Sequence, residues 1–326
     1  MPLTHSREGF SLLLAVALSA SALPVFAAAS SNIRIVNCDA AVASHKRGIC
    51  ENHLDEADFR ALAPGVSWYY NWNFETTEFP PSDVSMEYLP MAWGDQQGSL
   101  DGLDRYLENA TKKPRVVLAI NEPNLKGQAF IKPETTATLY KKIKDVADKY
   151  HLPVVGPNMS LGSPADGSIT ALDTIDNKEV TYTFMMPFVK AFYFFLGKDI
   201  QPPAVGLHTY GNLGEMKWAV EEMHKELNCP IWVTEYADWH AVDAQEERDY
   251  VIQATDFLER TPYVQGYSWF KERVPDNPKI SILDSTPGKL TPVGQIYVNM
   301  PPHEADIYYS IHGKLSAGKY TAMDQG

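Results

Sequence analysis

The sequence predicts an α/β protein built as a single (β/α)8 barrel of the TIM type. Short apolar runs of strand length alternate along the chain with longer segments that carry apolar residues at helical spacing. The chain has 326 residues, which suits one large domain, and it lacks the glycine-rich motifs of dinucleotide-binding sheets and phosphate-binding loops. Eight strand–helix units in about 300 residues favour a closed barrel over an open, doubly wound sheet.

Eight apolar runs are expected to form the barrel strands. In chain order they are residues 47–50, 66–72, 86–93, 115–120, 153–157, 204–210, 231–235 and 266–270. Apolar residues recur at helical spacing over 100–107, 139–150 and 216–227, and residues 185–196 are apolar almost all round, which is typical of a buried helix. Pro133 followed by Glu134 suits the first turn of a helix.

The N-terminal residues 1–28 have the pattern of a secretory signal peptide. Arg7 precedes the apolar stretch 10–22, and small residues follow it. This stretch is shorter than the roughly 20 residues that a bilayer span requires. We therefore expect a secreted or periplasmic protein. Its mature chain would consist of an N-terminal arm at 29–46, the barrel at 47–298 and a C-terminal extension at 299–326.

The predicted export places the cysteines in an oxidising compartment. Cys38 and Cys50 lie 50 − 38 = 12 positions apart, and a disulfide between them is expected. Closing a loop of that size would stabilise the fold by about 3 kcal/mol in the chain-entropy model. Cys229 opens the apolar run 230–233, which favours a buried, unreactive thiol.

The charge and the missing motifs exclude several function classes. With 28 basic and 41 acidic side chains, the formal net charge is −13. Nucleic-acid binders need clusters of Lys and Arg, so no nucleic-acid partner is expected. The sequence has no H-E-x-x-H or paired C-x-x-C pattern and no G-x-S-x-G elbow. We expect no cofactor, no metal, no membrane contact once the signal peptide is removed, and a monomer.

Polar and aromatic residues gather where the predicted strands end, and the active site of a (β/α)8 barrel forms at that face. They are Asn71, Trp72, Trp93, Asn121, Glu122, Asn158, His208, Tyr210, Glu235, Tyr236 and Trp269, with Trp239 in the loop after Glu235. Aromatic rings stack on sugar rings, amides and imidazoles bind hydroxyl groups, and paired carboxylates cleave glycosidic bonds. The sequence therefore indicates a site that binds and cleaves a carbohydrate.

Glu122 and Glu235 are the candidate catalytic pair. Each lies at the end of an apolar strand. An ionised glutamate is costly to bury unless it is paired or hydrogen-bonded, so such a strand delivers its carboxylate to a polar cavity. Either residue alone could be a salt-bridged structural glutamate at the rim of the barrel. Two of them at strand ends, among aromatic residues, favour catalysis.

The order of these motifs resembles that of the clan A glycoside hydrolases. Asn121-Glu122-Pro123, Thr234-Glu235-Tyr236 and Trp269 carry this likeness. More narrowly, four segments are similar to glycoside hydrolase family 128, namely WYYNW (68–72), LPMAWG (89–94), LHTY (207–210) and IWVTEYA (231–237). The resemblance spans residues 47–298. It implies a compact (β/α)8 barrel that hydrolyses β-1,3-glucan with retention of the anomeric configuration.

The same resemblance implies roles for the residues nearest the scissile bond. Glu122 would be the general acid/base and Glu235 the nucleophile, with their carboxyl groups about 5–5.5 Å apart, as in retaining enzymes. Asn121 would bind the sugar 2-hydroxyl. His208 and Tyr210 would orient or stabilise the nucleophile.

Aromatic and amide residues are expected to bind the rest of the substrate. Trp269 would floor the subsite of cleavage. The other candidates for substrate binding are Asn71, Trp72, Trp93, Asn158, Tyr236 and Trp239. Packing in the core is the alternative for Trp93.

The leading hypothesis is a secreted, retaining endo-β-1,3-glucanase. One alternative is a clan A hydrolase of another β-glycan, such as β-1,4-glucan or mannan, because linkage preference depends on loop shape. Loops 73–85 and 161–183 are expected to set that preference. The other alternative is a non-catalytic glucan-binding protein, against which the presence of both glutamates counts.

Overall fold

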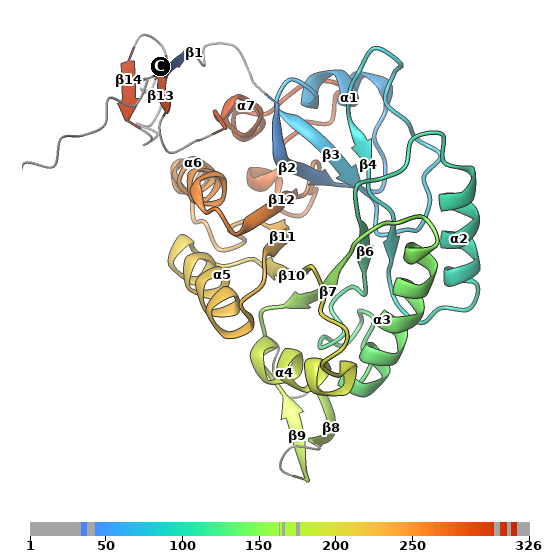
Figure 1. Ribbon diagram of the computed structural model, residues 1–326. Coiled ribbons are helices and arrows are strands. Elements are labelled where there is room, and N and C mark those ends of the chain that lie inside the picture. Colours follow the sequence, from blue (N-terminus) through green and yellow to red (C-terminus); the bar gives the residue numbers. More distant parts are fainter. Residues whose placement is uncertain are drawn as a thin grey trace, which may run out of the picture.

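The computed structural model describes residues 34–37, 43–162, 164, 167–173, 177–302, 307–311 and 314–317. Its centre is a nine-stranded sheet with neighbouring strands parallel, in the order β4-β3-β2-β12-β11-β10-β7-β6-β5 (Figure 1). These strands are β2 (Ser44–Cys50), β3 (Val66–Tyr70), β4 (Glu87–Tyr88), β5 (Met91–Ala92), β6 (Val117–Ala119), β7 (Val154–Ser160), β10 (Ala204–Thr209), β11 (Ile231–Tyr236) and β12 (Val264–Phe270).

The sheet closes into a barrel because its two edge strands belong to one segment of chain. β4 and β5 are separated only by Leu89 and Pro90, and β4 pairs with β3 while β5 pairs with β6. Pro90 has no N–H to donate, and its carbonyl oxygen accepts from the Leu118 N–H at 2.9 Å. With this segment counted once, the strands lie at the eight predicted positions. The predicted (β/α)8 barrel is confirmed.

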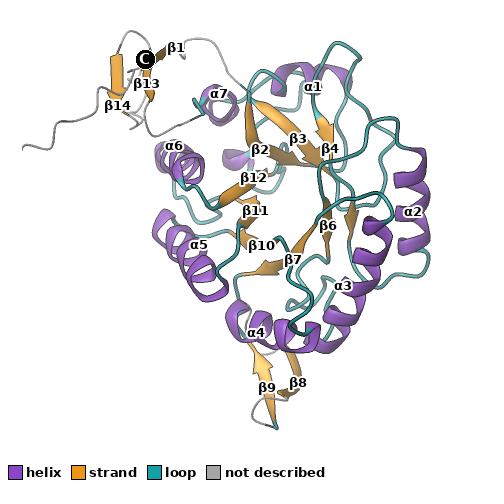
Figure 2. Ribbon diagram, in the orientation of Figure 1, coloured by secondary structure: helices purple, strands orange, loops and turns teal. Residues whose placement is uncertain are grey.

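Helices surround the barrel (Figure 2). They are α1 (Glu56–Leu62), α2 (Ser99–Asn109), α3 (Pro133–Asp148), α4 (Met185–Leu196), α5 (Leu213–Leu227), α6 (Ala244–Arg260) and α7 (Pro292–Asn299). The four helices predicted from apolar spacing, α2 to α5, are confirmed. Residues 71–86, all of them described, contain no helix, so β3 is followed by a loop. The expectation of a helix after every strand is wrong at this position.

Helix α6 was not predicted, because its first turn is polar. The side chain of Asp243 caps the helix by accepting from the N–H groups of Gln245 and Glu246. Its buried face includes Tyr250 and Leu258, which pack toward the barrel. The apolar face is therefore present, but it begins well after the N-cap.

The predicted loop 161–183 contains a hairpin. β8 (Ile169–Asp173) pairs antiparallel with β9 (Lys178–Tyr182), and the hairpin projects beyond α4 (Figure 1). Thr170 and Thr181 face each other across it, with their hydroxyl oxygens 2.8 Å apart. The segment is thus more regular than the sequence indicated.

The two ends of the described chain meet in a small, separate sheet. β1 (Arg34–Asn37) pairs in parallel with β13 (Ile307–Ile311), which pairs antiparallel with β14 (Lys314–Ala317). The predicted signal peptide, residues 1–28, lies outside the described residues. In the part of the chain that the structure describes, no helix combines the length and apolarity that a membrane crossing requires.

The predicted disulfide between Cys38 and Cys50 is not found. Cys50 is a free thiol that is fully buried inside the barrel, with its Sγ 3.1 Å from the carbonyl oxygen of Trp269. Cys38 lies outside the described residues. Spacing alone suggested the pair, but β2 ends with the Cys50 side chain directed into the barrel.

Side chains alternate between the barrel interior and the layer between sheet and helices. Trp68, Tyr70, Leu118 and Trp232 belong to one buried cluster inside the barrel. A much larger cluster fills the space between the strands and the surrounding helices. The direction of each strand residue therefore decides whether it can reach the C-terminal mouth of the barrel, where the site forms.

Glu247 on α6 makes stability depend on pH. It is fully buried, and neither carboxylate oxygen has a hydrogen-bond partner among the described residues. Burial, followed by the charge of Asp238, raises its pKa from 4.5 to about 8. The folded chain therefore keeps a proton that the unfolded chain loses above pH 4.5, so the free energy of unfolding falls as pH rises from about 4.5 to about 8.

Glu247→Gln is expected to raise the melting temperature clearly at pH 8 and much less at pH 5. The amide stays neutral at both values and so removes the cost of ionisation. Thermal denaturation of both proteins at the two pH values measures this. Glu108→Gln, at an exposed position of α2, is the matched control. An equal rise in melting temperature at pH 5 and pH 8 would contradict the raised pKa of Glu247.

Candidate active site

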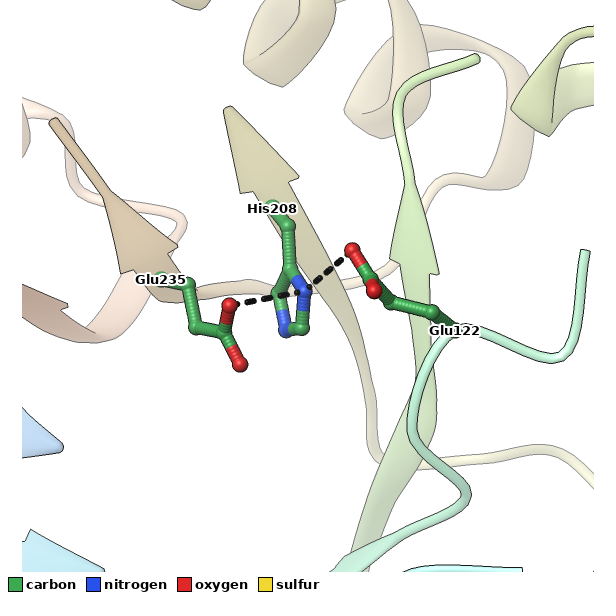
Figure 3. A group of neighbouring side chains, drawn as sticks. All are labelled: Glu122, His208 and Glu235. Carbon is green, nitrogen blue, oxygen red and sulfur yellow. Dashed lines mark hydrogen bonds and ion pairs between the residues drawn. The ribbon is translucent and has the colours of Figure 1, made fainter. Parts of the chain in front are cut away.

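Three buried titratable side chains meet at the C-terminal mouth of the barrel. Glu122 follows β6, His208 lies in β10 and Glu235 lies in β11. Figure 3 shows the imidazole of His208 between the two carboxylates. Each of the three side chains is at most 7% exposed. Strands distant in sequence thus bring both predicted glutamates and the predicted histidine together.

Several donors hold the carboxylate of Glu235. Trp72 Nε1–H donates to Oε1 at 2.7 Å. The single proton of the Tyr70 hydroxyl is shared between the same oxygen, at 3.2 Å, and the carbonyl oxygen of Thr234, at 3.0 Å. The Tyr210 hydroxyl donates to Oε2. Burial, with the charge of Glu122, leaves the pKa of Glu235 raised, while His208 and the hydrogen bonds from Tyr210 and Trp72 lower it in part. These donors stabilise the ionised form, which is the form a nucleophile needs.

His208 connects the two glutamates. Its Nδ1 lies 2.9 Å from Glu122 Oε1 and 3.3 Å from Glu235 Oε2. Burial lowers the pKa of His208, but the charges of Glu235 and Glu122 outweigh burial and leave the pKa raised. One ligand-type atom from each of the three side chains lies within 4.8 Å of the other two. This spacing of the carboxylates agrees with the roughly 5–5.5 Å of retaining glycosidases.

These three side chains are also the residues closest to a metal-binding arrangement within the described structure. Both oxygens of Glu235, however, already accept from Trp72, Tyr70 and Tyr210. The imidazole of His208, which can carry a proton, occupies the space between the two carboxylates. The donor set therefore fits the transfer of protons better than the binding of a cation.

The backbone at this mouth adopts uncommon conformations. Trp72, Ile120 and Glu122 have positive φ values of 60°, 59° and 41°. Such left-handed conformations cost of order 1–3 kcal/mol each in residues other than glycine and cluster at functional sites. They turn the chain sharply where β3 and β6 end. Trp72 and Glu122 thereby reach over the barrel interior.

An aromatic wall borders the carboxylates, and its central ring was not predicted. Phe270 is the last residue of β12. Its ring centroid lies 5.9 Å from that of Trp72, 5.2 Å from that of Tyr210 and 6.2 Å from that of Trp239. Trp239 is 39% exposed. The predicted residues Trp72, Tyr210 and Trp239 thus lie together around Phe270. The position of Phe270 at the end of a predicted strand could have identified it as a site residue from the sequence.

Trp269 does not floor the site, contrary to the prediction. It is fully buried, its Nε1–H donates to the carbonyl oxygen of Ile280 at 2.7 Å, and its ring packs 5.0 Å from Tyr236. Tyr236 points to the same outer layer, where its hydroxyl lies 2.9 Å from Thr255 Oγ1. The register between β11 and β12 shifts between Val233 and Tyr236, which turns Tyr236 away from the mouth.

Asn158 lies beneath the site rather than in contact with a substrate space. It is fully buried, and its Nδ2 donates to the carbonyl oxygen of Ala119 at 2.9 Å. Asn121 is 3% exposed and donates from Nδ2 to Gln128 Oε1 at 3.0 Å. Asn121 directly precedes Glu122, and its predicted contact with a sugar 2-hydroxyl stays a prediction.

A hollow of about 380 Å³ lies beside Trp72, whose Nε1–H donates to Glu235. It is lined by Asn71, Trp72 and Trp93, which were predicted, and by Gln96 and Gln97, which were not. Trp93 is partly exposed in this hollow, so its side chain is not confined to the core. The hollow therefore extends the site along the side where β3 and β5 end.

A larger hollow of about 620 Å³ lies elsewhere, on the outer side of β3 and β4 where a helix is missing. Tyr69, Tyr88 and Tyr106 line it, whereas Trp72, which links the smaller hollow to Glu235, does not. Size therefore does not identify the active site. The buried carboxylates do.

Comparisons with known proteins agree with this geometry. Residues 47–297 match the family model described as the glycosyl hydrolase catalytic core. No curated protein is significantly similar to the chain.

Solved structures similar to this chain include two GH128 subgroup II endo-β-1,3-glucanases. One, from Pseudomonas viridiflava, is 27% identical with a TM-score of 0.65, over 80% of this chain and 99% of the other. The second, from Sorangium cellulosum, is 26% identical with a TM-score of 0.68, over 79% of this chain and 100% of the other. The resemblance to glycoside hydrolase family 128 is confirmed.

A more distant structure shares the fold. It is a subgroup III curdlan-specific exo-β-1,3-glucanase from Blastomyces gilchristii, solved with glucose. It is 21% identical to this chain, with a TM-score of 0.60, over 78% of this chain and 97% of the other. Similar barrels in this group thus include both endo- and exo-acting enzymes.

Proposed function

Because the chain belongs to the glycosyl hydrolase catalytic core family, we propose that it is a retaining endo-β-1,3-glucanase. The observation that carries this proposal is the buried pair of carboxylates, Glu122 and Glu235, with oxygens within 4.8 Å on either side of His208. An inverting enzyme needs room for a water molecule between one carboxylate and the sugar, and this separation is too short to provide it. It favours direct attack on the sugar by one carboxylate.

In the first step Glu235 acts as the nucleophile. A carboxylate oxygen attacks the anomeric carbon, and the bond from that carbon to the glycosidic oxygen breaks. Glu122 gives its proton to the departing oxygen. The hydrogen bonds from Trp72 and Tyr210 orient the Glu235 carboxylate for this attack and favour its ionised form.

In the second step the covalent glycosyl-enzyme is hydrolysed. Glu122, now ionised, takes a proton from a water molecule, whose oxygen attacks the anomeric carbon. The bond to Glu235 breaks and its carboxylate is restored. Two inversions at the same carbon leave the product in the β configuration of the substrate.

The substrate and mode of attack are proposed from the relatives. The two structures at 27% and 26% identity are endo-β-1,3-glucanases, whereas the exo-acting structure from Blastomyces gilchristii is 21% identical. Trp72, Trp93 and Trp239 would bind successive glucose units. Secretion to the periplasm or the medium is proposed from the pattern of residues 1–28.

The test is the release of reducing ends from β-1,3-glucan, mixed-linkage glucan, β-1,4-glucan and β-mannan. We expect activity on β-1,3-linked substrates and early products of several lengths, as endo attack requires. Release of a single short product from the first minutes would favour exo attack. Activity only on β-1,4-glucan or mannan would support another clan A specificity. Retention on a glucan column without turnover would support a binding protein.

Tyr210→Phe is expected to reduce kcat by about 10- to 100-fold, because it removes a hydrogen bond to a charged carboxylate. The loss also raises the pKa of Glu235, so the acidic limb of the pH–rate profile should move to higher pH. Tyr236→Phe removes a hydroxyl from the outer layer and should leave kcat unchanged. Equal effects of the two variants would refute the role of Tyr210.

A further inference from the structure

A chain of hydrogen bonds runs from the barrel interior to His208. Asn158 Nδ2 donates to the carbonyl oxygen of Ala119 at 2.9 Å, which leaves its Oδ1 facing Thr234. The Thr234 hydroxyl donates to that Oδ1 at 2.9 Å. Thr234 Oγ1 in turn lies 3.1 Å from His208 Nε2. Asn158, Thr234 and His208 are each at most 1% exposed, so these bonds have no competition from solvent.

The direction of each bond follows from the number of protons available. A threonine hydroxyl has one proton, and Thr234 gives it to Asn158. Toward His208 it can therefore only accept, so Nε2 must carry a hydrogen. Neutral imidazole carries one proton, and the partner of one nitrogen decides which nitrogen bears it. This arrangement leaves Nδ1 of the neutral ring bare.

We propose that Asn158 and Thr234 are positioning residues that hold His208 in the Nε2–H tautomer, so that only Nδ1 exchanges a proton with the two catalytic glutamates. Nδ1 lies 2.9 Å from Glu122 Oε1 and 3.3 Å from Glu235 Oε2. The interpretation of these glutamates rests on the proposed function. The placement of the proton on His208 does not.

The proton on Nδ1 has defined consequences for both carboxylates. When Nδ1 is protonated, it donates to Glu122 or Glu235, and the imidazolium charge offsets one carboxylate. When Nδ1 is bare, it accepts from a protonated Glu122. The proton moves along the hydrogen bond between Nδ1 and a carboxylate oxygen, and the total number of protons on the two groups does not change. Because Nδ1 lies against both carboxylates, its proton state sets the charge that each of them faces.

Three further titratable side chains of the described structure lie close to His208 and its two glutamates, and each of the three is uncharged at neutral pH. Tyr70 and Tyr210 face Glu235 from β3 and from the end of β10, and the thiol of Cys50 lies nearby on β2. Burial raises the pKa of Tyr70, Tyr210 and Cys50 further above their ordinary values. The pH dependence of the site thus belongs to His208 and Glu235, whose pKa values are both raised.

The direct test is nitrogen NMR of the wild-type chain labelled with ¹⁵N-histidine. Two-bond ¹H–¹⁵N correlations distinguish the two tautomers, and comparison with His208→Gln assigns the signal among the nine histidines. We expect a protonated Nε2 at every pH and a change of protonation at Nδ1 alone. A neutral ring with its proton on Nδ1 would overturn the proposal. This measurement requires neither a substrate nor a variant of Thr234.

Thr234→Val extends the test to function. It removes the acceptor for Nε2–H. The imidazolium always carries a hydrogen on Nε2 and is left with an unpaired donor, whereas the neutral ring can move its one proton to Nδ1. The variant therefore destabilises the charged ring more than the neutral ring. The pKa of His208 should fall, and the basic limb of kcat/KM should move to lower pH by up to about one unit. We expect kcat to fall by about 10-fold with KM nearly unchanged.

Two further variants separate positioning from structural damage. Thr234→Ser restores the hydroxyl and should restore the profile. Thr255→Val removes a buried threonine hydroxyl of the outer layer that pairs with Tyr236, and should leave the profile unchanged. A Thr234→Val enzyme with a wild-type pH profile, or a serine variant that fails to rescue, would contradict the proposal. Absence of glucan hydrolysis in the wild type would refute the proposed function while the NMR result still stands.

Discussion

Glu235→Ala is expected to reduce turnover of β-1,3-glucan by at least about 10⁴-fold, because the variant lacks the carboxylate oxygen that forms the covalent glycosyl-enzyme. Trp72, Tyr70 and Tyr210 would still line the space but would have no carboxylate to orient. Release of reducing ends measures the loss. Binding to laminarin should persist, since the aromatic wall is intact. Equal turnover of variant and wild type would refute the assignment of the nucleophile.

Added azide separates loss of the nucleophile from loss of folding. In Glu235→Ala the space beneath the anomeric carbon is open, so azide can attack an aryl β-glucoside from that face. The aryl group leaves, and the product is the α-glycosyl azide, formed by one inversion. Glu235→Gln keeps the size of the side chain and should show neither hydrolysis nor rescue. A β-glycosyl azide from the alanine variant would contradict the role of Glu235.

Glu122→Ala is expected to reduce hydrolysis of unactivated glucan by about 10²- to 10⁴-fold, since the leaving oxygen no longer receives a proton. The loss should be much smaller for formation of the glycosyl-enzyme from a dinitrophenyl glycoside, whose leaving group needs no proton. A burst of dinitrophenol followed by slow turnover measures the two steps separately. The same loss for both substrates would contradict the role of general acid.

The azide product again discriminates between the two glutamates. In Glu122→Ala the covalent intermediate still forms on Glu235, and azide then attacks it from the opposite face. Two inversions give the β-glycosyl azide. The pair of variants should therefore yield azides of opposite configuration. An α-glycosyl azide from Glu122→Ala would show that the two roles are wrongly assigned.

The barrel was predictable because apolar periodicity reports burial directly. The runs at 115–120 and 266–270 are apolar enough to be recognised as strands, and they correspond to β6 and β12. Helix α6 was missed because its first turn is polar. The division of one strand into β4 and β5 at Pro90 depends on pairing with two different neighbours, which periodicity does not describe.

The site was only partly predictable, because the direction of each side chain depends on register. Glu122, His208 and Glu235 meet as expected. Trp269 and its neighbour Phe270 point to opposite sides of β12, and the sequence does not say which faces the mouth. The register shift between Val233 and Tyr236 turns Tyr236 outward and cannot be seen in the sequence.

The central claim is double displacement by Glu122 and Glu235, and the stereochemistry of the first product tests it most directly. Proton NMR of a laminari-oligosaccharide, recorded within minutes of adding enzyme and before mutarotation, shows the anomer that is released. Carboxylates with oxygens within 4.8 Å predict that the β-anomer appears first and the α-anomer follows only by equilibration. If the α-anomer appears first, the enzyme inverts, and Glu235 is not a covalent nucleophile.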